Sequence, residues 1–143
     1  MKRKPFPVVA VAEDDLDDQL LLKSAFEECR PDLKIHLFDD GESLLNFLAQ
    51  SGTYSEQESV PDLIIIDLHL AGGNGFDLLE EIKATPDLKR IPLIVLTGSA
   101  SDMEIKRCYE LGANTVITKP CLFGELVSTL KTLCNYWFGP IRM

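Results

Sequence analysis

The chain has 143 residues, of which 45% are hydrophobic and 26% charged, and its formal net charge at pH 7 is −9. This length suits one globular domain with a hydrophobic core, and so acidic a chain lacks the basic face that binds nucleic acid. No apolar run approaches the roughly 18 residues of a membrane span, and the apolar stretch 6–12 is too short for a signal peptide. We therefore expect one cytoplasmic domain, residues 1–143, with no nucleic-acid or membrane partner.

The four cysteines are Cys29, Cys108, Cys121 and Cys134, far apart in the chain, and only two histidines accompany them. This spacing is typical neither of a zinc site nor of a disulfide framework. We expect ordinary thiols in the core or on the surface.

Four short apolar runs divide the chain, at residues 8–12, 63–66, 93–96 and 115–118. They are continuous rather than alternating and rich in β-branched residues, which is typical of strands buried on both faces of a parallel sheet. The weaker candidate 34–38 is expected to be the second strand of the chain and to lie nearer an edge of the sheet.

Apolar residues recur at helical spacing between these runs. Ser101 and Glu104 form a capping box that begins a helix ending at Leu111, and Gly112 follows as its stop. The other expected apolar faces are Leu20, Leu21, Ala25, Phe26 and Cys29; Leu44, Leu45, Phe47 and Leu48; Phe76, Leu78, Leu79 and Ile82; and, in a last helix from near Leu122, Leu126, Leu130, Leu133 and Trp137.

Strand and helix alternate five times, which predicts an α/β fold with a doubly wound (βα)5 parallel sheet. The expected core spans residues 8–133, followed by a C-terminal helix extension, 134–143. The polar stretch 51–59 is expected to be an exposed loop before the third strand, longer than most connections.

Polar side chains follow the expected strands. The first strand ends at the acidic run 13–15, the third at Asp67, the fourth at Thr97 and the fifth at Lys119. Ligands of open parallel sheets bind at the carboxyl ends of the strands, so these side chains should converge. Three carboxylates about 5 Å apart repel by on the order of 3 kcal/mol per pair at an effective dielectric constant of 20. The sequence therefore predicts a bound cation, and Mg²⁺ takes such oxygen ligands.

With Mg²⁺ in place, Asp67 could attack phosphorus as a carboxylate nucleophile. The metal and Lys119 would neutralise charge on the transferring group, and Thr97 would donate a hydrogen bond to it. Each residue alone has an ordinary explanation, such as a turn for Asp67. For Asp17 and Asp18 we adopt the ordinary explanation, since acids favour helix N-termini. The joint placement at strand ends is what indicates chemistry.

The motifs at these strand ends resemble those of bacterial two-component receiver domains. They are Ala-Glu13-Asp14-Asp, Ile-Asp67-Leu-His-Leu, Val-Leu-Thr97-Gly-Ser and Thr-Lys119-Pro120. The resemblance covers Val8 to about Leu133 and implies the flavodoxin-like receiver fold. It also implies a phosphorylation-dependent response regulator that accepts a phosphoryl group from a histidine kinase. Such a protein is not an enzyme beyond self-phosphorylation and self-dephosphorylation.

The resemblance implies a role for each matching acidic residue. Asp67 would be the phosphoryl acceptor and a ligand of Mg²⁺. Asp14 would bind the metal directly and Glu13 more peripherally, while the main-chain carbonyl of His69 would complete the shell.

Switching is implied in the same way. Thr97 would be the switch hydroxyl, Lys119 would contact the phosphoryl group, and the Lys119–Pro120 bond is expected to be cis. Receivers usually carry an aromatic residue where this chain has Val116, so we expect the response to be confined to residues 97–101 and the helix that follows. A partner face is expected on that helix, the fifth strand and the last helix, with apolar contacts from Met103, Tyr109 and Trp137. The loop after Asp67 also lacks the usual proline, and we expect its glycine-rich segment 71–75 to be a flexible turn.

The long loop and the tail 136–138 resemble a narrower subgroup, the small stand-alone regulators that serve phytochrome kinases of cyanobacterial type. That implies a phytochrome-like sensor histidine kinase, or a histidine phosphotransfer protein, as partner, and a homodimer as an assembly. We expect Trp137 itself to pack on the core of its own domain.

Three other functions fit less well. A phosphohydrolase of the haloacid-dehalogenase type needs a second carboxylate two residues after the nucleophile, where this chain has His69. A degenerate receiver used only for docking would have lost some of the site residues that are intact here. A flavodoxin would need a phosphate-binding loop where this chain carries the acidic run 13–18.

Overall fold

Five parallel strands form a single sheet at the centre of the molecule, in the order β2-β1-β3-β4-β5. The computed structural model describes residues 6–53, 61–70 and 75–139. All strand pairs are parallel, which confirms the expected fold class. The strands are β1 (Val8–Ala12), β2 (Lys34–Phe38), β3 (Leu63–Ile66), β4 (Leu93–Thr97) and β5 (Thr115–Thr118).

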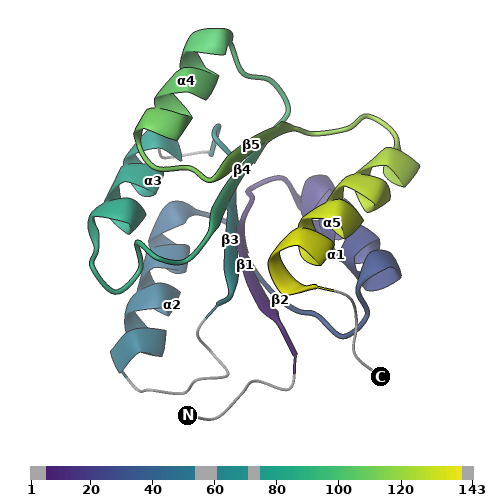
Figure 1. Cartoon of the computed structure of the whole chain (residues 1–143), viewed down its shortest axis with the longest axis horizontal. Coiled ribbons are helices and arrows are strands. Elements are labelled where there is room, and N and C mark those ends of the chain that lie inside the picture. The colour runs from purple at the N-terminus through teal and green to yellow at the C-terminus, as the bar shows by residue number, and fades with distance from the viewer. Residues whose placement is uncertain (1–5, 54–60, 71–74, 140–143) are drawn as a thin grey trace.

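Helices cover both faces of the sheet (Figure 1), with α1 and α5 on one side and α2, α3 and α4 on the other. Each follows a strand, as a doubly wound fold requires. The helices are α1 (Leu16–Cys29), α2 (Gly41–Thr53), α3 (Gly75–Ala84), α4 (Asp102–Glu110) and α5 (Phe123–Phe138).

The three inner strands β1, β3 and β4 are buried along their whole length. Successive side chains alternate between the two helical layers: Val9 and Val11 pack with α1 and α5, whereas Ala10 and Ala12 pack with α2 and α3. Such alternation is a consequence of the strand period of two. The register pairs the end of β1 with the end of β3 and β3 with β4, so the residues that follow these strands leave at the same edge.

The two outer strands are less buried than the inner ones. The expectation that 34–38 lies at an edge is confirmed, because β2 pairs only with β1. For 115–118 the expectation of full burial is wrong: β5 is also an edge strand, and its residues are partly buried, with the last one exposed. A continuous apolar run cannot distinguish an inner strand from an edge strand, because both faces of the edge strand β5 still pack on helical layers, through Val116 and Ile117.

The first helix buries the expected Ala25 and Phe26, with Cys29 partly buried beside them, but the expectation is wrong for Leu20 and Leu21. Leu20 and Leu21 are 64% and 46% exposed, whereas Leu22, Ala25 and Phe26 are buried. Three consecutive leucines give no periodicity of their own, and only the packing of α1 against α5 and the sheet decides which leucine points inward.

The expected start and end of α4 are both confirmed. Ser101 and Glu104 form the expected capping box at α4, and Leu111 is its C-cap. Gly112 has a φ of 114°, a conformation that favours glycine, directly after that helix. In α5 the expected packing of Trp137 on the core of its own domain is confirmed.

Other local expectations differ from the structure or lie outside it. Residues 51–53 continue α2 rather than opening the loop expected from 51 to 59. The described residues do not include the rest of that loop, 54–59, the turn residues 71–74 or the end of the expected extension, 140–143.

The described residues contain no cis peptide bond, so the expected cis Lys119–Pro120 bond is wrong. Trans is the intrinsically favoured form, by about 0.5–1 kcal/mol before proline. Among the described helices none has the length and apolar character of a membrane span.

We predict that Gly75→Ala destabilises the fold and that Gly124→Ala does not. A Cβ at Gly75 would meet the backbone of Leu68, 2.7 Å from its Cα and 2.8 Å from its carbonyl carbon, so the backbone beside the site would have to move. Overpacking of this kind costs about 1–3 kcal/mol. A Cβ at Gly124 meets nothing within 4 Å, and alanine in a helix gains about 0.5–1 kcal/mol over glycine.

Urea denaturation of both variants measures the change in the free energy of unfolding. An unchanged stability of Gly75→Ala would contradict the close approach of the two backbones.

Candidate functional site

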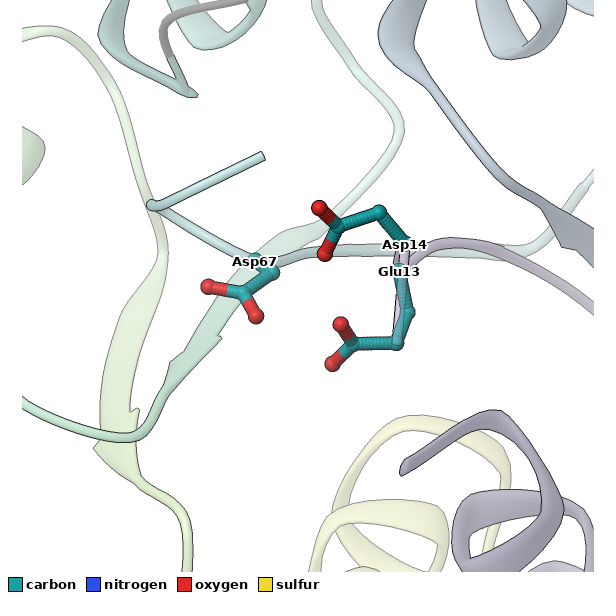
Figure 2. Close-up of side chains that lie close together, drawn as sticks. All are labelled: Glu13, Asp14 and Asp67. Atoms are coloured by element: carbon teal, nitrogen blue, oxygen red, sulfur yellow. The ribbon is translucent and has the colours of Figure 1, made fainter. Parts of the chain in front are cut away.

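Three carboxylates meet at the carboxyl edge of the sheet (Figure 2). Glu13 and Asp14 follow β1, Asp67 follows β3, and each of the three places one carboxylate oxygen within 4.8 Å of the others. This convergence of the expected acidic residues follows from the register of β1 and β3, whose last residues, Ala12 and Ile66, are paired. The Asp67 N–H donates to the carbonyl of Ala12 at 3.0 Å, which extends the pairing one residue into the site.

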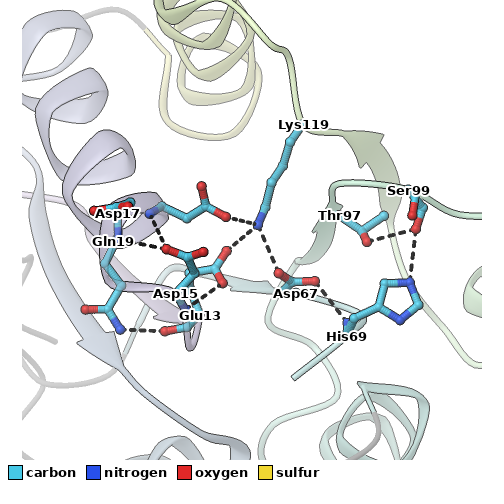
Figure 3. A network of polar contacts seen from close by, with 10 residues as sticks. Glu13, Asp15, Asp17, Gln19, Asp67, His69, Thr97, Ser99 and Lys119 are labelled. Carbon is cyan, nitrogen blue, oxygen red and sulfur yellow. Dashed lines mark hydrogen bonds and ion pairs between the residues drawn. The ribbon is translucent and has the colours of Figure 1, made fainter. Parts of the chain in front are cut away.

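Lys119 supplies the positive charge of the site (Figure 3). It follows β5, and its Nζ forms ion pairs with Glu13, with Asp67 Oδ2 at 2.9 Å and with Asp18 Oδ2 at 2.8 Å. A single ammonium therefore bridges two acids of the run 13–18 to Asp67, which lies far away in the sequence. Lysine has three N–H donors, and all three find an acceptor here.

Burial and these ion pairs shift the acid–base properties of the site. Burial raises the pKa of Glu13 to about 7, against the opposing pull of Lys119. Burial also acts to raise the pKa of Asp67, but the N–H of His69 and the Lys119 ammonium outweigh it and hold that pKa below its usual range. The pKa of Lys119 is raised, because its ion pairs outweigh its burial. At neutral pH the site therefore holds an ionised Asp67 beside a charged lysine.

The start of α1 holds the acidic run in place. Asp15 is the N-cap, and its Oδ1 accepts from the N–H groups of Asp17 and Asp18 at 2.8 and 3.2 Å. The buried Gln19 donates from its amide to the Glu13 carbonyl and to Asp39 Oδ1, at 2.8 Å from the latter. The helix start thus directs Asp15 to capping, while Glu13 and Asp14 turn toward Asp67.

One functional residue was missed by the sequence reasoning. The ordinary explanation holds for Asp17, which is exposed, but Asp18 is an ion-pair partner of Lys119 as well as a first-turn acid. The sequence carried no local signal for this role, because the contact joins residues 101 positions apart.

Thr97 and His69 meet at a single carbonyl group on the loop after β4. The buried Thr97 donates its hydroxyl to the Ser99 carbonyl at 3.2 Å, and Nε2 of His69 lies 3.0 Å from the same oxygen. The main-chain N–H of His69 donates to Asp67 Oδ1 at 2.9 Å. The Thr97 hydroxyl is therefore near the site but engaged with its own loop.

The donor set fits a hard divalent cation. Three carboxylates offer the oxygen ligands that Mg²⁺, Mn²⁺ and Ca²⁺ prefer, and the mixture of one buried and two partly buried side chains leaves a side open to water. A cation bound there would share Glu13 and Asp67 with Lys119.

The class of protein follows from this fold and site. A family model described as the response regulator receiver domain matches residues 9–131, so the chain belongs to that family of two-component signalling proteins. Such domains receive signals from histidine kinases or phosphotransfer proteins and bind a divalent metal.

Individual relatives are similar over nearly the whole chain. The response regulator Rcp1 of Synechocystis sp. is 32% identical over 97% of this chain and 94% of its own length. The probable methanogenesis regulatory protein FilR2 of Methanothrix harundinacea is 31% identical over 94% of this chain and 85% of its own. A crystal structure of the phosphorylated cyanobacterial phytochrome response regulator RcpA has a TM-score of 0.84 at 31% identity, covering 96% of this chain and 97% of that one.

We predict that Lys119→Met destabilises the metal-free protein in a pH-dependent way. It leaves Glu13, 2% exposed, without its cation, and breaking a buried pair costs about 3 kcal/mol. Glu13 can accept a proton in place of the ammonium. The wild-type carboxylate stays ionised above about pH 7, so the loss should shrink by about 1 kcal/mol per pH unit from pH 9 to pH 7.

Denaturation of wild type and variant in a chelator, at several pH values, measures this loss. Asp18→Asn is the matched control, because it removes only the partly exposed partner and should cost less than about 1 kcal/mol. A loss for Lys119→Met that is the same at pH 9 and pH 7 would contradict the buried Glu13–Lys119 pairing.

Proposed function

We propose that Asp67 is the phosphoryl acceptor of a single receiver domain spanning residues 1–143, and that a sensor histidine kinase or phosphotransfer protein is the donor. The observation that carries the proposal is an ionised aspartate at the end of β3, held between a charged Lys119 and the acids Glu13 and Asp14. The phosphorylated state of RcpA, a relative of similar structure, supports it.

The transfer needs little covalent chemistry from the protein. An oxygen of Asp67 forms a bond to phosphorus while the bond from phosphorus to the donor nitrogen of phosphohistidine breaks, and that nitrogen keeps the electron pair. Lys119 neutralises charge on the phosphoryl oxygens, and Thr97 donates a hydrogen bond to one of them. Self-phosphorylation from a small phosphodonor and hydrolysis of the acyl phosphate would be its only reactions, so the chain acts as a signalling acceptor and not as an enzyme on other substrates.

Mg²⁺ is the metal we assign to this site. Glu13, Asp14 and Asp67 would hold it with their carboxylates, and His69 with its main-chain carbonyl; when bound, it supplies charge neutralisation for the transferring group. Oxygen donors of this kind suit Mg²⁺, and an Mn²⁺-bound crystal structure of Rcp1, with a TM-score of 0.80 at 32% identity over 96% of this chain and 98% of that one, supports divalent-metal binding.

A phytochrome-like histidine kinase in the cytoplasm is the partner that we propose, on the strength of the similarity to Rcp1 and RcpA. The exposed leucines Leu16 and Leu20 of α1, together with Leu122 before α5, are available to it beside the acidic run. They are 69%, 64% and 64% exposed, so a partner could contact them without any rearrangement of this chain.

The output face that we propose lies on α4, β5 and α5, and homodimerisation through it is one way to pass the signal on. Met103 is 82% exposed there. Tyr109 is partly exposed, and its hydroxyl accepts from the N–H of Val116 at 3.1 Å. Since valine replaces the usual aromatic residue of β5, the aromatic group of this face comes from α4 instead.

We predict that acetyl phosphate with Mg²⁺ adds one phosphoryl group to the protein and that Asp67→Asn abolishes the addition. The amide cannot act as the nucleophile, although it keeps the size of the side chain. Intact-mass measurement gives the result directly, with Asp17→Asn as the control, since Asp17 is exposed and its side chain is outside the acidic cluster. Undiminished labelling of Asp67→Asn would refute the assignment.

We predict that Asp14→Ala weakens Mg²⁺ binding far more than Asp15→Ala does. Asp14 belongs to the carboxylate cluster, and loss of such a ligand costs about tenfold or more in affinity. The side chain of Asp15 caps α1 instead, so its removal should cost about 1 kcal/mol of stability and little metal affinity. Isothermal titration with Mg²⁺ ranks the two variants, and a larger effect of Asp15→Ala would show that the metal lies elsewhere.

A further inference from the structure

The Ser99 carbonyl is shared by two side chains that come from different strand ends (Figure 3). The Thr97 hydroxyl donates to it at 3.2 Å, and Nε2 of His69 lies 3.0 Å away. A carbonyl oxygen only accepts hydrogen bonds, so Nε2 carries the proton in this contact. The loop after β4 is therefore bonded through one atom both to its own threonine and to the loop after β3.

The contact matters because Thr97 has a single hydroxyl proton. While that proton is donated to Ser99, it is not available to any acceptor at Asp67. Thr97 itself is fully buried at the end of β4, so its backbone is held by the sheet and only the hydroxyl direction is free to change. The position of the Ser99 carbonyl then decides how readily Thr97 gives up its present acceptor.

His69 is held by hydrogen bonds from both its main chain and its side chain. Its main-chain N–H donates to Asp67 Oδ1 at 2.9 Å, and its ring reaches Ser99. His69 also lies near Glu104, which belongs to the capping box at the start of α4. The pKa of Glu104 is lowered mainly by the hydrogen bond from the Ser101 N–H, and His69 adds to this lowering. One residue thus connects the acceptor aspartate with the loop and helix that follow Thr97.

We propose that His69 is a positioning residue, whose ring holds the Ser99 carbonyl where it keeps the Thr97 hydroxyl turned away from Asp67. This inference rests on the proposed role of Thr97 as donor to the phosphoryl group. In the unphosphorylated protein the His69–Ser99–Thr97 contacts stabilise the inactive direction of the hydroxyl. Phosphorylation must break the Thr97–Ser99 bond, and the ring of His69 makes that step more costly by fixing its acceptor.

The physical consequence is a bias between two states. An interaction that stabilises one state more than the other shifts the equilibrium by the difference in its free energy. A net hydrogen bond of ordinary strength changes such an equilibrium by roughly two- to tenfold. Removing the ring should therefore favour the phosphorylated arrangement, while the main-chain N–H of His69, and with it the contact to Asp67, stays in place.

The test measures the dissociation constant of beryllofluoride, a phosphoryl mimic, in Mg²⁺ by isothermal titration of the full chain. We expect His69→Ala to bind it roughly two- to tenfold more tightly than wild type. His69→Gln, whose amide can donate to Ser99, should restore much of the wild-type affinity. In a Thr97→Val background His69→Ala should have no further effect, because the ring acts through the threonine hydroxyl.

Each other outcome overturns the inference. Unchanged or weaker binding by His69→Ala would show that the ring does not bias Thr97. An alanine effect that persists in the Thr97→Val background would show that the ring acts by blocking access to Asp67, and a glutamine variant that behaves like alanine would rule out the hydrogen bond. Absence of beryllofluoride binding by wild type would instead refute the proposed function, so the two failures are distinguishable.

Discussion

The contact on which this site depends is the Lys119 ammonium held among the carboxylates of Glu13, Asp18 and Asp67. Acids from β1, α1 and β3 repel one another at this spacing, and in a partly buried site water screens that repulsion poorly. A single cation on a flexible stem offsets it without fixing the acids rigidly. The same ammonium would be available to a phosphoryl group on the proposed acceptor Asp67, so the interaction that holds the metal-free site together would also prepare it for an anionic ligand.

The sheet positions the chemistry, and the loops leave it free to respond. β1, β3 and β4 are buried on both faces, and their paired ends bring Glu13, Asp67 and Thr97 to one edge. Strands so well packed hold functional groups more accurately than loops do. The next residues along, His69 and Ser99, belong to loops, where a change in one hydrogen bond moves little of the core. The proposed acceptor, fixed by the sheet, and the loop residues His69 and Ser99 are therefore neighbours at this edge.

The missing aromatic residue of β5 has a structural counterpart here. Val116 is small and partly exposed on an edge strand. Its N–H donates a hydrogen bond to the hydroxyl of Tyr109 from α4. An unpaired N–H on an edge strand is a site at which another chain can add, and the tyrosine covers it. At Val116 the edge of β5 is thus closed to strand addition by a side chain of α4, while the exposed side chains of α4 stay accessible.

The sequence alone determined the strands and their ends, because continuous β-branched runs have few alternatives, and with the rule for parallel sheets this placed Glu13, Asp14, Asp67, Thr97 and Lys119 at one edge. Only the tertiary structure decided which leucines of α1 point inward, that β5 lies at an edge, and that Asp18 and the Ser99 carbonyl belong to the site. The physical reason is the sequence separation of the contacts that decide these features. Local patterns report the period of a helix or strand, whereas the Lys119–Asp18 contact spans 101 residues and depends on how two loops and a helix start pack together.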